Sequence, residues 1–130
     1  MTQITEVRPV LVLLPRLSDG RIILLHRLQR WQLPEEPLLP GADLRAAATD
    51  LLHRTTDYVP GQLSALGTLD SGARCYLAEQ LRPSPFPPVH VGRAMTTAVS
   101  PAELQRLVRL GHVACPTLLA ALQLLAAAVG

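Results

Sequence analysis

Four carboxylates near the middle of the sequence are the residues whose types and spacing could do chemistry. They lie in the stretch Trp31–Tyr58, which reads WQLPEEPLLPGADLRAAATDLLHRTTDY. Glu35 and Glu36 are adjacent, and Asp43 and Asp50 have the spacing of two side chains on one face of a helix. Carboxylates are the side chains that bind Mg²⁺ in proteins, so these four are the candidates for a metal site.

The same acids also have a structural interpretation. Asp43 would cap the N-terminus of the helix or compensate its dipole, and Asp50 would form an ion pair with Arg54 one turn later. Glu35 and Glu36 would then be solvated acids of a loop. The sequence leaves both interpretations open.

A helix over about residues 42–55 would position these groups. Gly41 closes the preceding loop, which is bounded by prolines, and Asp43 stands where an N-cap residue is expected. The stripe that indicates the helix recurs at spacings of three and four residues and consists of Leu44, Ala47, Ala48, Leu51, Leu52 and Thr55.

The remaining elements follow from composition and turn signals. Val7–Leu14 is rich in Val and Leu, which predicts a strand buried on both faces, and Ser18–Gly20 predicts a hairpin turn into a second strand, Arg21–Arg27. Ser100 is the expected N-cap of a later helix. The other predicted elements are strands at Leu63–Leu69, Ala73–Glu79 and Val89–Val99, a proline-rich loop at Arg82–Pro88, and helices at about 101–110 and 116–129.

The stretch Trp31–Tyr58 resembles a Nudix box, the strand–loop–helix signature of the Nudix hydrolase family. The box runs W-x-L-P-G-G, then a loop that ends in G-E, then A-A-x-R-E-L-x-E-E-T-G-Y. The chain's ending, GHVACPTLLAALQLLA, is similar to the terminal helix of the ADP-ribose pyrophosphatase branch. The residues that match the box without a gap are Trp31, Leu33, Pro34, Gly41, Ala47, Ala48, Leu52, Thr56 and Tyr58.

The positions that carry the family's chemistry hold different residues in this chain. In the loop, Glu35 and Glu36 stand at the paired glycines of the box, and Ala42 stands at the loop glutamate. In the helix, Asp50-Leu51 stands at the Arg-Glu pair, and Arg54-Thr55 stands at the metal-binding Glu-Glu pair. Asp57 stands at the glycine that follows. Leucine cannot bind a metal ion, and a charged arginine repels one. The resemblance therefore implies the framework of the box without its metal-binding residues.

The fold that the resemblance implies is α/β: a Nudix-like α/β/α sandwich with a mixed β-sheet, formed by a single domain of residues 1–130. A chain of this length buries roughly two thirds of its unfolded surface. From Leu118 to Val129 the terminal helix is apolar except for Gln123, so it should be buried on every side. We therefore expect a homodimer, which resemblance to the ADP-ribose pyrophosphatase branch also implies.

The missing box glutamates favour a function without catalysis. The first hypothesis is a catalytically degenerate Nudix-fold protein that uses no metal cofactor and binds a nucleotide-type small molecule or acts as an interaction module. Arg54 could then hold a phosphate directly as a bidentate donor. Arg27, His26 and His53 are the residues that would complete this pocket.

Two further hypotheses remain open. One is a residual or rearranged Mg²⁺-dependent hydrolase of nucleoside diphosphate derivatives such as ADP-ribose, with Asp43, Asp50, Glu35 and Glu36 as its local carboxylates. The other is a purely structural dimer with an empty cleft. Hydrolysis separates the enzyme from both alternatives, and stabilisation by a ligand separates a binding protein from a structural one.

Composition argues against other partners. The net charge is only +2, all 12 basic residues are scattered arginines, and there are one Trp, one Phe and two Tyr, so nucleic acid is not expected. The longest apolar run, Leu118–Val129, is shorter than the ~20 residues of a membrane span. The N-terminus lacks the basic region of a signal peptide, and the dispersed histidines and two cysteines give no zinc motif. A cytoplasmic protein is expected.

Overall fold

The structure, a computed structural model, describes residues 9–27, 29–88, 94–113 and 115–129. It contains short strands and three helices in an order typical of an α/β domain. Its elements are β1 (Val10–Pro15), β2 (Ile22–Arg27), β3 (Arg30–Gln32), β4 (Glu35–Pro37), α1 (Leu44–Thr56), β5 (Tyr58–Val59), β6 (Gln62–Thr68), β7 (Arg74–Glu79), β8 (Arg82–Pro83), β9 (Met95–Val99), α2 (Pro101–Arg109) and α3 (Pro116–Val129).

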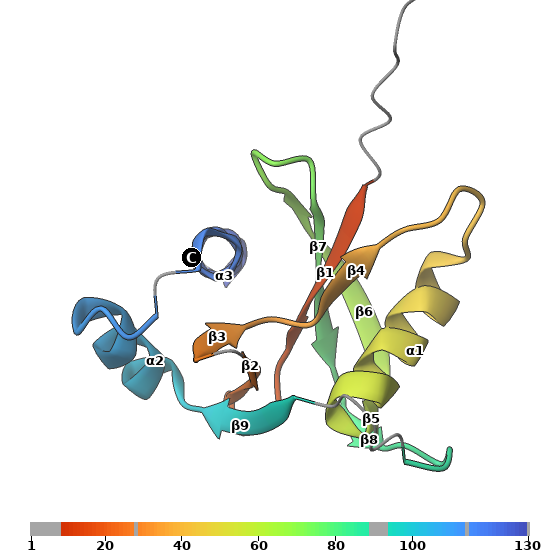
Figure 1. Cartoon of the computed structure of the whole chain (residues 1–130), viewed down its shortest axis with the longest axis horizontal. Coiled ribbons are helices and arrows are strands. Elements are labelled where there is room, and N and C mark those ends of the chain that lie inside the picture. Colours follow the sequence, from red (N-terminus) through yellow and green to blue (C-terminus); the bar gives the residue numbers. More distant parts are fainter. Residues whose placement is uncertain (1–8, 28, 89–93, 114, 130) are drawn as a thin grey trace, which may run out of the picture.

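A four-stranded sheet in the order β4-β1-β7-β6 forms the middle of the fold (Figure 1). β1 and β7 are parallel, and β4 and β6 run antiparallel to their neighbours. α1 lies on one side of this sheet, whereas α3 lies on the other side, together with a second sheet of order β3-β2-β9 (Figure 1). The prediction of an α/β fold with a mixed sheet between helices is confirmed.

β1 is buried on both of its faces, as its composition predicts. Leu11 and Leu13 belong to the hydrophobic cluster that includes α1, whereas Val12 and Leu14 belong to the cluster that includes α3. All four side chains are completely inaccessible to solvent. Because successive side chains of a strand point to opposite faces, one apolar run supplies both layers of the core.

The predicted hairpin between the first two strands is wrong in one respect. The turn at Ser18–Gly20 exists, and the backbone N–H of Leu17 donates to the carbonyl of Arg21 at 2.8 Å. Beyond a single bridge between Arg16 and Ile22, however, β1 and β2 belong to different sheets. Both edges of β1 are already hydrogen-bonded, one to β4 and the other to β7, so β2 pairs with β3 and β9 instead.

Two segments predicted as loops contain short strands. Glu35–Pro37 is β4, which pairs with β1 so that Leu11 lies opposite Glu36 and Val12 opposite Glu35. Arg82–Pro83 is β8, which pairs with β5, and the rest of the proline-rich segment up to Pro88 is irregular. In both cases an open edge elsewhere in the chain captures a segment whose prolines argue against a strand.

The helices agree closely with the prediction. α1 spans Leu44–Thr56, and its N-cap is Asp43, whose carboxylate accepts from the backbone N–H of Arg45 at 3.1 Å. α2 begins after Ser100, whose Oγ accepts from the backbone N–H of Glu103 at 3.1 Å. The predicted strand Val89–Val99 is observed only as β9, because residues 89–93 lie outside the described part of the chain.

α3 is buried along one face. Leu118 and Ala121 are fully buried in the core, whereas Gln123 and residues 126–128 are exposed in the single chain. Part of α3 is therefore accessible in the single chain, and the expected homodimer, which would cover it, stays a prediction. Among the described residues, no helix combines the length and hydropathy that crossing a membrane requires.

The contribution of α3 to the core can be measured by truncating Leu118, which has no accessible surface. We expect Leu118→Ala to lower the free energy of unfolding by about 2–5 kcal/mol, because the lost methyl groups leave a cavity in the core. The matched control is Leu39→Ala, since Leu39 is 63% exposed, and its effect should stay within about 0.5 kcal/mol. Equal midpoints for the two variants in urea denaturation would contradict the packing of α3.

Candidate functional site

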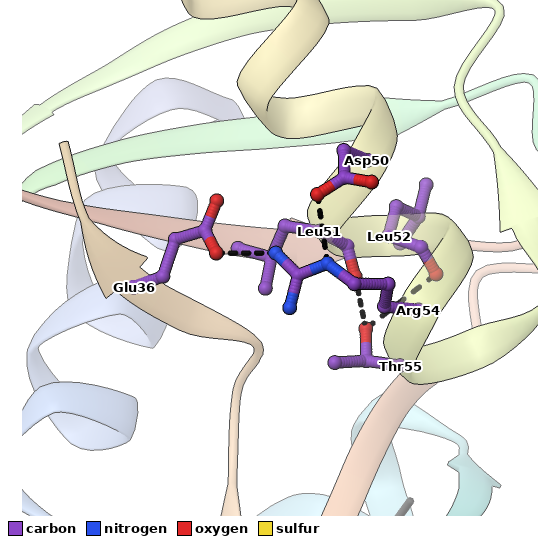
Figure 2. Close-up of polar contacts among 6 residues, drawn as sticks. All are labelled: Glu36, Asp50, Leu51, Leu52, Arg54 and Thr55. Atoms are coloured by element: carbon purple, nitrogen blue, oxygen red, sulfur yellow. Dashed lines mark hydrogen bonds and ion pairs between the residues drawn. The ribbon is translucent and has the colours of Figure 1, made fainter. Parts of the chain in front are cut away.

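Arg54 is the centre of a polar cluster that joins α1 to β4 (Figure 2). Its Nε donates to Oδ2 of Asp50 at 2.7 Å, one helical turn earlier, and its Nη2 donates to Oε2 of Glu36. Of the three side chains, Glu36 is the most buried, with 26% of its surface accessible, compared with 39% for Arg54 and 62% for Asp50. We refer to Glu36, Asp50 and Arg54 as the arginine cluster.

The pairing of β4 explains why Glu36 reaches α1. Glu36 lies directly opposite Leu11 in the antiparallel pair, and residues opposite each other project from the same face of a sheet. Leu11 packs in the cluster that includes α1, so Glu36 projects toward that helix as well. The pair between Asp50 and Arg54 was predicted, whereas the pair between Glu36 and Arg54 was not. A strand at residues 35–37, with Glu35 and Glu36 on opposite faces, would have predicted this pair, but the flanking prolines argued against a strand there.

Electrostatics keeps the guanidinium of the arginine cluster charged. Desolvation acts to lower the pKa of Arg54, but its hydrogen bonds and charge interactions with Asp50 and Glu36 outweigh this effect and raise the pKa above its usual value. Two carboxylates share one cation, so the cluster carries excess negative charge. The geometry can hold two chain segments together, and it gives both acids a counter-ion from within the chain.

The other predicted carboxylates lie apart from this cluster. Asp43 caps α1, which confirms its structural interpretation. Glu35 lies opposite Val12, whose side chain packs on the α3 side of the sheet, so Glu35 projects away from Arg54. Although Glu35 remains accessible to solvent, partial desolvation of its carboxyl group raises its pKa. The structure thus brings together two of the four predicted acids.

The residues predicted to complete a phosphate pocket lie on different elements. His26 is half-buried in β2, and its ring lies 4.5 Å from that of Trp31. His53 is only 8% exposed and contacts Phe86 edge-on, with ring centroids 5.6 Å apart. Arg27 is exposed at the end of β2, where it lies opposite Arg30. Of this set, Arg27 and Arg54 offer the most accessible donors to a ligand.

Cys75 and Cys115 are free cysteines. Cys75 is completely buried in β7, and burial raises the pKa of its thiol to about 11. The thiol therefore stays protonated at neutral pH, whereas a nucleophilic cysteine needs its thiolate. Cys115 is partly buried and packs against the core on the α3 side.

A mixed sheet between α1 and α3, with a strand, a short connection and α1 in sequence, defines the class of fold. Comparison with solved structures shows which known fold this arrangement matches. The chain is similar to an ADP compounds hydrolase, with a TM-score of 0.71 and 16% identity over 92% of this chain and 71% of that one. It is equally similar to a Nudix hydrolase from Nitrosomonas europaea, with a TM-score of 0.70 and 13% identity over 93% of this chain and 89% of that one.

A third similar structure is the Nudix domain of NrtR from Shewanella oneidensis, solved in complex with ADP ribose. Its TM-score is 0.61, with 16% identity over 79% of each chain. The sequence itself matches no protein-family model and no curated protein. The likenesses are therefore ones of structure, and they show that this chain has the Nudix fold.

The Nudix fold implies Mg²⁺, and the residues at the box positions do not fit this ion. Mg²⁺ requires oxygen ligands in octahedral geometry. Leu51 is buried in the core, Arg54 pairs with both nearby acids, and Thr55 Oγ1 donates to the carbonyl of Leu51 at 2.7 Å (Figure 2). In the part of the chain that the structure describes, no three His, Cys, Asp or Glu residues are grouped to hold a metal ion.

The strength of the arginine cluster can be measured by removing its cation. Arg54→Ala should lower the free energy of unfolding by about 1 kcal/mol, because partly exposed ion pairs contribute roughly 0.2–1 kcal/mol each. Arg45→Ala is the matched control, since Arg45 is exposed on the same helix and its side chain pairs with no described residue; its effect should be close to zero. Urea denaturation at low salt and at 1 M NaCl tests this, and the difference should shrink at high salt.

The two neighbouring glutamates of β4 should respond oppositely to loss of charge. The raised pKa of Glu35 means that the fold disfavours its carboxylate, so stability from this group is lost as pH rises through the folded pKa. Glu35→Gln should therefore raise the melting temperature slightly at pH 7 and leave it unchanged below about pH 4. Glu36→Gln weakens the pair with Arg54, so it should lower the melting temperature at pH 7. Shifts of the same sign at pH 7 would contradict this assignment.

Proposed function

We propose that this chain is a catalytically degenerate Nudix-fold protein that binds a nucleotide-type small molecule, as a sensor or interaction module, without metal-dependent hydrolysis. The arginine cluster carries this proposal. Its guanidinium binds both Glu36 and Asp50, so one positive charge of the chain itself is shared by these two acids. A divalent cation that bound Oδ2 of Asp50 and Oε2 of Glu36 together would have to displace Arg54.

The proposed ligand contact uses the part of Arg54 that the cluster leaves available. A guanidinium has five N–H groups, and the two recorded hydrogen bonds use Nε and Nη2, so Nη1 forms no bond with a described residue. A phosphate oxygen can accept from Nη1 without breaking either ion pair. The excess negative charge of the cluster weakens this contact. Arg27, the other arginine of the predicted pocket, belongs to the sheet on the α3 side, so we do not assign it to the same phosphate.

Two structural neighbours guide the choice of probe. The Nudix domain of NrtR is described in complex with ADP ribose, and another neighbour is described as a hydrolase of ADP compounds. A nucleoside diphosphate linked to a sugar is therefore the first ligand class to test. The alternative of a rearranged hydrolase rests on the arginine cluster itself. Glu36 and Asp50 both contact Arg54, so both carboxylates would become available together if Arg54 moved away.

Hydrolysis is tested with the purified full chain, Mg²⁺ or Mn²⁺, and a panel of ADP-ribose, dinucleotides, nucleotide sugars and nucleoside triphosphates. We expect no turnover, since the loss of metal assistance costs at least about a thousandfold in rate. Turnover that disappears in Asp50→Ala would establish a rearranged hydrolytic site instead. Asp43→Asn is a suitable control, because that change keeps a helix cap and lies outside the arginine cluster.

Binding is tested by calorimetry of ADP-ribose in the presence of a chelator. The wild-type chain should bind, Arg54→Ala should bind about tenfold more weakly, and Arg45→Ala should bind like the wild type. Equal affinities for all three proteins would remove Arg54 from the site. If no member of the panel binds or raises the melting temperature, the chain is a structural module, and the proposal of a ligand sensor fails.

A further inference from the structure

A groove of about 1110 Å³ lies between α2, α3 and the turn that joins β1 to β2. These elements are on the side of the central sheet opposite α1 (Figure 1). None of the three residues of the arginine cluster lines the groove. Small-molecule sites occupy roughly 300–1,000 Å³, so the space is large enough for a ligand of that class and remains open to solvent.

Aliphatic side chains from two helices form the walls of this groove. Leu104 and Val108 face it from α2, one helical turn apart, and Leu119, Leu122 and Leu125 face it from α3 at spacings of three. Among the described residues that line the groove, none is aromatic. A nucleobase or a sugar ring usually stacks on an aromatic side chain, and this groove offers no such platform. Its walls instead match a flexible aliphatic chain.

The charges of the groove identify the polar end of a suitable ligand. Arg16 and Glu79 both line the groove, and Arg16 Nη2 donates to Glu79 Oε2 at 2.6 Å, so their charges cancel. Arg109 also lines the groove, at the end of α2, and its side chain pairs with no described acid. One cation therefore remains uncompensated beside the aliphatic walls. Charge complementarity calls for a ligand with a single anionic group.

We propose that this groove binds an aliphatic carboxylate, a molecule of the fatty-acid class. Its hydrocarbon chain lies between α2 and α3, and its carboxylate accepts hydrogen bonds from the guanidinium of Arg109. The site is separate from the proposed nucleotide contact at Arg54 and goes beyond it, so the two can be tested independently. The flexible hydrocarbon chain of such a ligand can adapt to the aliphatic walls and needs no aromatic side chain to stack on.

The first measurement is calorimetric titration of the wild-type chain with dodecanoate, below the concentration at which it forms micelles. Decanoate and octanoate follow as shorter probes. Each pair of methylene groups removed should weaken binding by up to about fifteenfold, because each buried methylene contributes about 0.8 kcal/mol. No binding of dodecanoate, or affinities that are independent of chain length, would overturn the proposal.

Two pairs of variants locate the ligand in the groove. Arg109→Gln should weaken dodecanoate binding about fivefold and leave the binding of the uncharged 1-dodecanol unchanged, as expected for one exposed ion pair. Its control is Arg106→Gln, because Arg106 is exposed on the same helix and lies outside the groove. Ala126→Phe should obstruct the α3 wall of the groove and weaken binding, whereas Ala127→Phe should not, since Ala127 is also exposed but does not line the groove.

Gln105→Trp is a second blocking variant, on the opposite wall, for use if Ala126→Phe melts at a lower temperature than the wild type. Unchanged affinity in a folded blocking variant would overturn the proposal. The expected homodimer provides another way to cover the same helix. If light scattering shows a dimer that Ala126→Phe dissociates and Ala127→Phe does not, a second copy of the chain occupies the groove, and the proposal of a lipid-like ligand is wrong.

Discussion

β1 is buried on both faces and hydrogen-bonded along both edges, and the places of the other elements follow from this. An interior strand cannot leave its backbone N–H and C=O groups unpaired, because each would cost free energy comparable to a lost hydrogen bond. β7 pairs with one edge and β4 with the other, so β2, which follows directly in the chain, must leave the sheet. The alternating leucines and valine of β1 then fix which helix covers which face.

The arginine cluster is a consequence of the same pairing. β4 takes its register from β1, and this register turns Glu36 toward α1 and Glu35 away from it. Two adjacent glutamates thus have different environments. Glu36 is paired with a guanidinium, whereas Glu35 is partly desolvated and forms no ion pair with another described residue. A guanidinium suits this position because it is permanently charged and presents several N–H groups in one plane, so it can contact carboxylates from two elements at once.

The sequence predicted those parts of the fold that have a local signal. The spacing of Leu44 to Leu52 predicted α1, Ser100 marked the start of α2, and the Val- and Leu-rich composition predicted a doubly buried strand. β4 and the separation of β1 from β2 were missed, because each depends on which distant segment occupies an edge. For the same reason the sequence predicted the pair between Asp50 and Arg54, one helical turn apart, and missed the partner that comes from β4.

The central sheet separates two surfaces with different chemistry. On the α1 side, Glu36 and Asp50 share one guanidinium, and a ligand must compete with these two carboxylates for Arg54. On the α3 side, the ion pair of Arg16 and Glu79 leaves Arg109 available beside aliphatic walls. Substitutions at sites without shared contacts usually have additive effects on free energy. The two surfaces share no lining residue. An effect of one ligand on the affinity for the other would therefore be transmitted through β1 and β7 of the central sheet, and their close packing resists small displacements.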